Sequence, residues 1–216
     1  MGVDEAIAAL RAGKPIIVFD SGEREREADL MVHAQFAGPD KIELLRKDGG
    51  GLICLATDRN VAEKLSLPFL TDFYSEKGNE TLKKIVYNKT QYGDKPSFSI
   101  TINHNDTYTG ITDDDRSMTA REFAKLTADA QNGKEIREKF ERDFKAPGHL
   151  HLLIGKTLAE RKGHTELALE LCRRAKLPPA MLLCEMLGKG KALSVEQARE
   201  YAKKNGIPFV VGRELL

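Results

Sequence analysis

Two short segments carry most of the side chains that could perform chemistry. Residues 24–29 read Arg-Glu-Arg-Glu-Ala-Asp and directly follow an apolar, strand-like run. Residues 161–166 read Arg-Lys-Gly-His-Thr-Glu and begin a helix-like run. Carboxylates and an imidazole can bind a divalent metal ion, and the cationic side chains can bind phosphate. Together the two segments indicate a site that holds a divalent metal against a phosphorylated small molecule.

The first segment also has a simpler interpretation, because a run of charges in a turn is more often a solvated surface than a site. Its position favours function, since it follows the apolar run 16–19 and Gly22, where an α/β sheet presents its loops to ligands. Glu25 and Asp29 share a face on either a helix or a strand, and Glu27 joins them on a strand. Two convergent carboxylates repel one another unless a cation lies between them. The pattern leaves both a surface turn and a metal site open.

His164 lies in a Gly-His-Thr turn where the second segment becomes helix-like. The unpaired backbone N–H groups of a helix start, with the Thr165 hydroxyl and the Arg161 side chain, suit a phosphate group. His164 would then lie beside the phosphate, in a position to bind a metal. A single histidine is more often structural, and the same residues also describe a helix capped by Thr165 with Glu166 stabilising its dipole. The two interpretations are compatible.

The other histidines carry weaker signals. His149 and His151 lie in one strand-like run, and we expect one of them to face the core and the other the opposite surface. A structural and a functional role are about equally supported for this pair. His33 and His104 have no partner motif, so we assign them structural roles.

Three further features are interpreted as structural. Residues 113–116 (Asp-Asp-Asp-Arg) are expected to form or cap a turn rather than to bind metal. Residues 188–191 (Gly-Lys-Gly-Lys) lack the spacing of a phosphate-binding loop and are expected to form a turn. Cys54 and Cys184 lie in apolar runs and are expected to be buried, unreactive thiols.

Composition excludes several classes of protein. The chain has 216 residues, 41% hydrophobic and 31% charged, which is enough for a folded core and unlike a disordered chain. Lys and Arg (34) nearly balance Asp and Glu (33), whereas a dedicated nucleic-acid binder carries a basic excess. Three scattered cysteines and the lack of an apolar signal sequence predict a cytoplasmic protein, and no apolar run is long enough to span a membrane.

Helix-like and strand-like patterns alternate along the chain, without repeats or low-complexity tracts. Predicted helices cover residues 4–12, 39–47, 57–65, 119–130, 165–175 and 194–205, and predicted strands cover residues 16–19, 30–32, 52–55, 98–102, 149–154, 180–185 and 208–211. Residues 71–95 show no period and are predicted to be a long loop, of a kind that often covers a site. The alternation predicts one α+β (mixed α/β) domain over residues 1–216, a three-layer sandwich with helices on both faces of a mixed, twisted sheet.

Several segments, taken in chain order, resemble the 3,4-dihydroxy-2-butanone 4-phosphate synthase family of riboflavin biosynthesis. The resemblance runs from Ile16 to Leu215. Its landmarks are residues 24–29 (Arg-Glu-x-Glu-x-Asp), 51–55 (Gly-Leu-Ile-Cys-Leu), 109–112 (Thr-Gly-Ile-Thr) with 115–116 (Asp-Arg), 147–149 (Pro-Gly-His), 161–166 (Arg-x-Gly-His-Thr-Glu) and 183–185 (Leu-Cys-Glu). Each landmark alone is weak, but their order and the interval from His164 to Glu185 are typical of the family.

The resemblance implies a magnesium-dependent lyase that converts D-ribulose 5-phosphate into L-3,4-dihydroxy-2-butanone 4-phosphate and formate, the formate coming from C4. By resemblance, Glu25 and His164 bind the metal, and His149 and Glu185 are catalytic. Because proton transfer needs a carboxylate and an imidazole within reach, Asp29 joins these two as a predicted catalytic residue. The implied substrate-binding set, in which Arg161 and Thr165 contact the phosphate, is Arg24, Glu25, Asp29, Arg161, Lys162, Gly163, His164, Thr165 and Glu185. Glu27 is expected to support these residues. The family also implies a homodimer with its sites near the subunit interface. The balanced charge and the lack of a long apolar run predict no nucleic-acid or membrane partner.

The chemistry of the residues agrees with this resemblance. Enolising a ketose phosphate, losing water and migrating a carbon all build negative charge on adjacent oxygens, which a chelated divalent ion stabilises. Magnesium prefers oxygen ligands, and the histidine ligand would let manganese replace it. One alternative is another metal-dependent sugar-phosphate isomerase or aldolase. A second is a nucleotide- or RNA-binding module of a similar three-layer fold, which the near-zero net charge and the 6% aromatic content disfavour.

Overall fold

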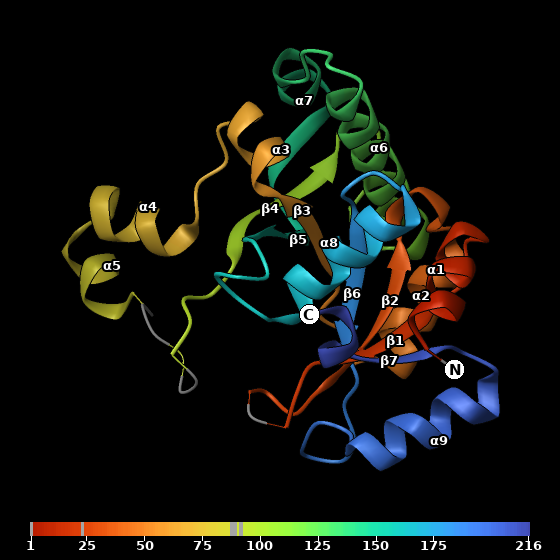
Figure 1. The fold of residues 1–216 in the computed structure, drawn as a ribbon. Helices are drawn as coiled ribbons and strands as arrows, with labels where there is room; N and C mark the ends of the chain where they lie inside the picture. The colour runs from red at the N-terminus through yellow and green to blue at the C-terminus, as the bar shows by residue number, and fades with distance from the viewer. Residues whose placement is uncertain (1, 23, 87–89, 91–92) are drawn as a thin grey trace.

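A mixed sheet forms the middle layer of the molecule (Figure 1). The computed structural model of the chain describes residues 2–22, 24–86, 90 and 93–216. Across the sheet the strands run in the order β4 (Phe98–His104), β5 (Phe144–Gly155), β3 (Cys54–Asp58), β6 (Met181–Glu185), β2 (Ala28–His33), β1 (Ile16–Phe19) and β7 (Phe209–Val211). Strand β3 pairs in parallel with β5, and β1 with β7, whereas β1–β2, β2–β6, β3–β6 and β4–β5 are antiparallel. The predicted mixed sheet is confirmed.

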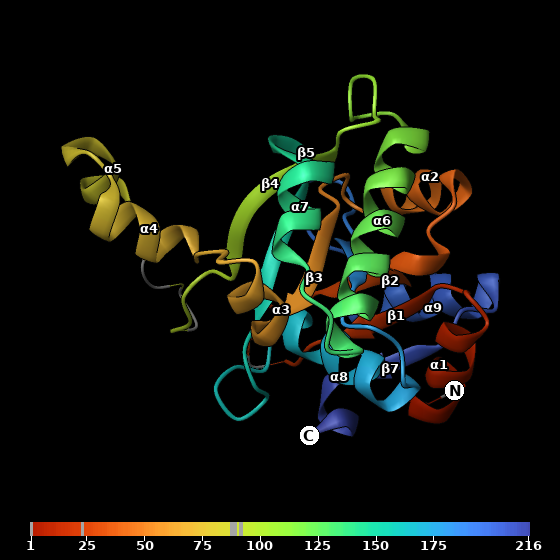
Figure 2. The same ribbon diagram turned by 90° about the horizontal axis from the view of Figure 1, so that it is seen from above.

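Helices cover both faces of this sheet, which confirms the predicted three layers (Figure 2). The helices α1 (Val3–Arg11) and α8 (His164–Ala175) pack on one face. The helices α2 (Pro39–Asp48), α6 (Asp113–Gln131) and α9 (Val195–Asn205) pack on the other. Shorter helices are α3 (Arg59–Lys64), α7 (Arg137–Asp143) and the 3-10 turns Ala34–Phe36 and Gly212–Leu215. In the described part of the chain, no helix is long and apolar enough to cross a membrane.

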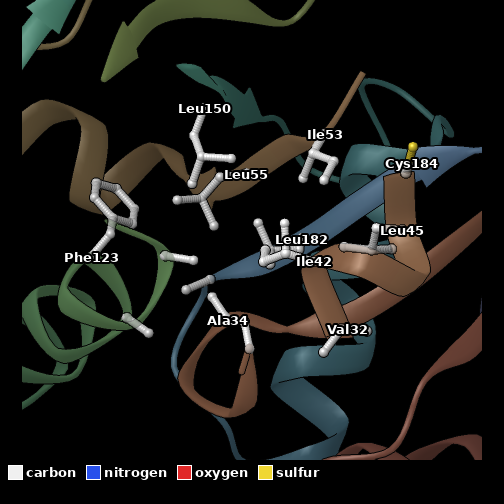
Figure 3. Close-up of a cluster of buried hydrophobic side chains, with 14 of the residues drawn as sticks. Val32, Ala34, Ile42, Leu45, Ile53, Leu55, Phe123, Leu150, Leu182 and Cys184 are labelled. Carbon is white, nitrogen blue, oxygen red and sulfur yellow. The ribbon is translucent and has the colours of Figure 1, made fainter. Parts of the chain in front are cut away.

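Alternating strand residues build the larger core, between the sheet and the α2–α6–α9 layer. Figure 3 shows Val32, Leu55 and Leu182 of three different strands directed toward Ile42 of α2 and Phe123 of α6. All five side chains are at most 1% exposed. Burying one such side chain stabilises the fold by about 1.5–3 kcal/mol, so the side chains on this face of the sheet serve to stabilise the fold. The opposite face of the same strands is free to carry polar side chains at its edge.

Most predicted elements are present, and their ends differ for local reasons. Helix α6 begins at Asp113, earlier than predicted, because the Thr112 hydroxyl accepts a hydrogen bond from the Asp115 N–H and caps it. The three aspartates therefore form the first turn of a helix, where carboxylates favour the dipole. Strand β3 begins at Cys54, and Leu52, predicted inside it, is 51% exposed. Strand β5 begins earlier than predicted, and α7 lies in a charged part of the chain that no predicted helix or strand covers.

The prediction of a loop over residues 71–95 is wrong for most of its length. Two helices, α4 (Leu70–Lys77) and α5 (Glu80–Ile85), form an arm that projects away from the sheet (Figures 1 and 2). Only Thr71 of these two helices is buried, so no apolar stripe marks them in the sequence. The Asn79 side chain caps α5 by accepting from the Leu82 N–H. Residues 87–89 and 91–92 of the predicted loop lie outside the described residues.

The expectation that His149 and His151 face opposite sides is also wrong. Side chains two residues apart on a strand share a face, and Leu150 between them fills the core, fully buried. His149 is exposed, and His151 is partly covered by the Phe98 ring at 6.1 Å between centroids. By contrast, His33 is structural as predicted, because one ring nitrogen accepts from the Gln35 N–H and the other donates to the Pro178 carbonyl.

Candidate active site

The turn between β1 and β2 is organised by Asp20, a residue that the sequence did not single out. Its side chain is buried and accepts hydrogen bonds from the Glu25 N–H at 3.0 Å and the Glu27 N–H at 3.2 Å. Arg26 between them has φ 62°, a left-handed conformation that non-glycine residues adopt only when their surroundings enforce it. The buried Asp20 side chain therefore holds the turn in one conformation, and the interpretation of residues 24–29 as a simple solvated surface turn is wrong.

His164, the first residue of α8, points into this turn. Its Nδ1 lies 3.1 Å from Glu25 Oε2 and 3.6 Å from Asp29 Oδ1. Its Nε2 lies 3.1 Å from the Glu27 carbonyl oxygen, which can only accept, so Nε2 carries a proton and donates. This second contact fixes the ring and directs Nδ1 toward the two carboxylates, the arrangement by which proteins orient metal-binding histidines.

The charges around His164 favour a cation between its ring and the carboxylates of Glu25 and Asp29. Burial alone would lower the pKa of His164, but the charge of Asp29 and the hydrogen bond to Glu25 raise it to about 9. A proton therefore takes the position that a metal ion would fill. The ligand atoms of Asp20, Glu25 and His164 all lie within 4.8 Å of one another. Because both Asp20 oxygens already accept backbone N–H bonds, Glu25 and His164 fit a divalent metal better than Asp20 does.

Three carboxyl groups lie together on the sheet beside His164. Asp29 of β2 is paired directly opposite Glu185 of β6, and Glu27 immediately precedes β2. Burial, with the charges of Glu25 and Glu185, raises the pKa of Asp29 to about 6 against the lowering effect of His164. Burial and the neighbouring Glu185 raise the pKa of Glu27 to about 7. Carboxyl groups that hold protons near neutral pH can act as acids and bases.

A positively charged corner adjoins the carboxylates at the start of α8. Arg161 donates from Nη1 to Glu166 Oε2 at 2.6 Å, and the same oxygen accepts from the Gly163 N–H at 3.2 Å. Gly163 is the N-cap of α8, which corrects the expected cap at Thr165, while the expected role of Glu166 at the helix start is confirmed. Thr165 is buried in the first turn, where backbone N–H groups have no helical partner. This corner suits an anion.

A cavity of about 710 Å³ joins these groups. Its polar wall contains predicted site residues from three separate segments, namely Glu25, Asp29, Arg161, His164, Thr165 and Glu185, together with Glu27. Its apolar wall comes from the sheet and from the arm, namely Leu52, Cys54, Phe98, Leu153, Leu183, Leu70, Tyr74, Leu82, Ile85 and Val86. The two opening segments of the sequence therefore form one site, as the chemistry of their residues predicted.

Some predicted residues lie outside the cavity wall. Lys162 is exposed, and Gly163 is buried behind the wall as the cap of α8. Arg24 lies just beside the wall, with Nη1 at 2.9 Å from Glu25 Oε2. His149 does not line the cavity; its ring contacts the Asn103 side chain at 3.1 Å, in the exposed half of β5. The structure thus separates His149 from the other proposed catalytic residues of the same chain.

Sequence reasoning missed the place of three residues in this region. Asp20 follows an apolar strand, and a single aspartate there reads as a simple turn former. Cys54 is a buried, unreactive thiol as predicted, since it is 7% exposed and burial, with the charge of Asp29, raises its pKa to about 12. Its place in the cavity wall was not predicted. Asp94, in the segment predicted to be a loop, binds Arg24 at 3.0 Å. No local pattern distinguishes these residues, because each depends on a contact with a distant part of the chain.

Comparison with known proteins gives one consistent result. Residues 4–216 match the family described as 3,4-dihydroxy-2-butanone 4-phosphate synthase. The enzyme of that name from Archaeoglobus fulgidus is 42% identical over 99% of this chain and 92% of its own length. The Methanosarcina mazei enzyme of the same name is 41% identical over 99% of this chain and 89% of its own.

Solved structures agree with the sequence relatives. The Candida albicans 3,4-dihydroxy-2-butanone 4-phosphate synthase shares 27% identity and superposes with a TM-score of 0.76, over 100% of this chain and 95% of that one. Another enzyme of this name, in complex with two magnesium ions, shares the fold with a TM-score of 0.79 at 22% identity, over 100% of this chain and 94% of that one. The nucleotide- or RNA-binding alternative is not favoured. The chain belongs to the 3,4-dihydroxy-2-butanone 4-phosphate synthase family.

Proposed function

We propose that this chain converts D-ribulose 5-phosphate into L-3,4-dihydroxy-2-butanone 4-phosphate and formate, as a magnesium-dependent step of riboflavin biosynthesis. The observation that supports the proposal most is the composition of one cavity, whose wall combines Glu25 and His164 with an acidic pair and an anion-binding corner. Family membership supports the same reaction. The reaction balances without an oxidant or reductant, because the two products together contain all the atoms of the substrate.

The anion-binding corner is the proposed seat of the substrate phosphate. Arg161 and Thr165 lie at the start of α8, where the free N–H groups and the guanidinium both attract a phosphate group. Gly163 allows close approach at this point, because a Cβ there would collide with the Arg161 guanidinium. Arg24 and the exposed Lys162 add positive charge at the rim of the site. These contacts would hold the sugar with its carbonyl end toward Glu25 and His164.

Glu25 and His164 are the proposed metal ligands, and magnesium is the proposed metal. One carboxylate and one imidazole leave room for oxygens of the substrate, as magnesium sites in enzymes commonly do. Bound there, the ion would stabilise negative charge on adjacent sugar oxygens. Manganese, which accepts imidazole more readily, is expected to replace it. The magnesium ions of the related solved structure support this choice of metal.

Asp29 and Glu185 are the proposed acid and base. Asp29 lies 3.6 Å from His164 and directly opposite Glu185, so both carboxyls face the space beside the metal ligands. A pKa of about 6 lets Asp29 both accept and return a proton near neutral pH. The apolar wall of the cavity keeps water from reactive intermediates. Glu27, whose pKa is raised to about 7, would keep a proton close to Glu185.

His149 is proposed to act in the site of a second copy of the chain. It is exposed and does not line the cavity of its own chain, and Tyr108 and Ile111 of the β4–α6 loop are 96% and 49% exposed. The proposed homodimer would cover these apolar side chains and bring His149 to the partner's cavity. Three buried, unpaired cysteines agree with the proposed cytoplasmic location, where thiols remain reduced.

Labelled substrate tests the reaction. Ribulose 5-phosphate carrying carbon-13 at C4, incubated with the protein and magnesium, should yield labelled formate and unlabelled butanone phosphate by nuclear magnetic resonance. Chelation of the metal should stop both products. An isomerase would give only new pentose phosphates and an aldolase would give two- and three-carbon fragments, and either outcome would rule out the proposed lyase.

Mixing two inactive variants tests the shared site. His149→Ala and Glu25→Gln should each be inactive alone. If His149 serves the partner's site, refolding the two variants together should restore about a quarter of wild-type activity, because half of the dimers are mixed and each mixed dimer keeps one intact site. No recovery, with dimers formed normally, would contradict this assignment.

A further inference from the structure

One carboxylate from outside residues 24–29 and 161–166 contacts both arginines of the anion-binding corner. Asp94 Oδ2 accepts a hydrogen bond from Arg24 Nε at 3.0 Å, and the same oxygen lies 3.5 Å from Arg161 Nε. The Arg24 and Arg161 side chains are only 10% and 8% exposed. A Cβ built on Gly163 would collide with both guanidinium groups, so the two cations share one small space at the start of α8.

The position between two guanidinium groups at a helix start is where a phosphate would bind most strongly. Guanidinium groups pair with phosphate through paired N–H donors, and the helix start adds backbone N–H groups and a favourable dipole. In the structure, one carboxylate oxygen of Asp94 lies within 3.5 Å of both side chains. A carboxylate there is an internal substitute for the phosphate anion.

Asp94 is also the carboxylate of this corner that can leave most easily. Glu166 has a fully buried side chain and accepts from the N–H groups of Lys156 and Gly163 in addition to Arg161. Asp20 is likewise buried and holds the β1–β2 turn. The Asp94 side chain is 25% exposed, and among the described residues it contacts the two arginines.

We propose that Asp94 is a latch, which occupies the phosphate position in the free protein and is displaced when the substrate phosphate binds. The proposal rests on the proposed function, because it takes the Arg24–Arg161 corner as the phosphate site. A phosphate dianion brings more charge than the carboxylate and can bind both guanidinium groups in parallel pairs. Displacement therefore exchanges a weaker anion for a stronger one without leaving either buried arginine unpaired.

The latch connects phosphate binding to the wall of the cavity. Asp94 is held to Thr90 by hydrogen bonds from its N–H to Thr90 Oγ1 and from the Thr90 N–H to its carbonyl. Thr90, Pro96 and Ser97 line the cavity. When Asp94 leaves the arginines, this segment loses its ionic attachment to the body of the protein. Occupancy of the phosphate corner and the position of this part of the wall are thus coupled.

The affinity for inorganic phosphate tests the latch directly. If the site binds phosphate only while Asp94 is displaced, its apparent affinity equals the intrinsic affinity multiplied by the fraction of time that Asp94 is displaced. Asp94→Asn, which keeps the shape and removes the charge, should therefore bind inorganic phosphate about three- to tenfold more tightly than wild type in calorimetric titrations. Asp72→Asn is the matched control, because it removes a carboxylate that pairs with exposed Lys95 and touches neither arginine. It should leave phosphate affinity unchanged.

Hydrogen exchange measured on the wild-type protein is a second test of the latch, and it needs no variant. Saturating inorganic phosphate should speed backbone exchange at residues 93–97 while slowing it at the start of α8. Unchanged or weaker phosphate binding by Asp94→Asn, an equal effect in Asp72→Asn, or slower exchange at residues 93–97 would each overturn the latch.

The same experiments separate failure of the latch from failure of the proposed function. Formate release from ribulose 5-phosphate is measured in parallel on the wild-type protein. Tighter phosphate binding in Asp94→Asn without any formate from wild type would support the latch and refute the reaction. Formate release with no effect of Asp94→Asn on phosphate binding would refute the latch alone.

Discussion

Asp29 of β2 lies directly opposite Glu185 of β6, which places two carboxyl side chains side by side on the face of the sheet that α1 and α8 cover. The pair comes from strands that are adjacent in space but more than 150 residues apart in the chain. Burial and the neighbouring negative charges raise the pKa of Asp29 to about 6, which disfavours its ionised form in the folded protein. The carboxyl pair therefore lowers the stability of the folded protein, which is typical of groups that are held in place for catalysis.

Replacing this aspartate should separate activity from stability. In Asp29→Asn we expect turnover to fall about 100- to 10,000-fold, the usual contribution of a positioned acid or base. Its raised pKa means that the carboxyl stabilises the fold when protonated and loses that contribution as the pH rises through about 6. The variant should therefore gain more in melting temperature at pH 8 than at pH 5. A variant that loses activity and stability together at pH 8 would identify Asp29 as structural instead.

Arg161 should matter for folding as well as for phosphate. Its partner Glu166 has a fully buried side chain, so Arg161→Met leaves a buried carboxylate without its cation. We expect a loss of about 3 kcal/mol in the free energy of unfolding, measured by urea denaturation. Arg59→Met is the control, because Arg59 and Glu160 form an exposed pair at 3.1 Å that should contribute below about 1 kcal/mol. Equal losses in the two variants would contradict the view that Glu166 depends on Arg161.

Thr165→Val tests the phosphate corner without disturbing that ion pair. The substitution keeps the volume of the buried side chain and removes its hydroxyl. Loss of one hydrogen bond to a charged group corresponds to about 1.5–3 kcal/mol, or roughly ten- to hundredfold weaker binding of inorganic phosphate. Calorimetric titration measures this loss, and an unchanged melting temperature shows that the fold is intact. Unaltered phosphate affinity would place the anion elsewhere.

His33 should make the fold sensitive to acid. Burial lowers the pKa of His33 below 6.5 against the effect of the Pro178 carbonyl, and both ring nitrogens are already engaged in the neutral form. The unfolded chain therefore binds a proton below about pH 6.5 that the folded protein resists, so stability falls as the pH falls through this range. His33→Gln, which retains a donor for the carbonyl, should lose less melting temperature between pH 7 and pH 5 than wild type. An identical pH dependence in both proteins would argue against this role.

The sequence predicted those helices and strands that are determined by residues close together in the chain. The apolar run 16–19 forms strand β1 as predicted. Helix α9 begins after its predicted cap, Ser194. The arm α4–α5 was missed because its helices bury almost nothing, so their sequence lacks the stripe that identifies a helix. Among site residues, Glu25 and His164 were recognisable from their segments. Asp20 and Asp94 were not, because their roles depend on partners that only the fold brings within reach.

The proposed reaction depends most on Glu25 and His164 holding the metal that turnover requires. The decisive measurement is formate release from ribulose 5-phosphate over a magnesium titration, for wild type, Glu25→Gln and Glu27→Gln. Glu27→Gln is the matched control, since it removes a carboxylate from the same turn, and its carbonyl still accepts from His164 Nε2. We predict magnesium-dependent formate release by wild type, slower but still magnesium-dependent release by Glu27→Gln, and none by Glu25→Gln although it folds normally. Near-normal release by Glu25→Gln at saturating substrate would contradict the metal site described here.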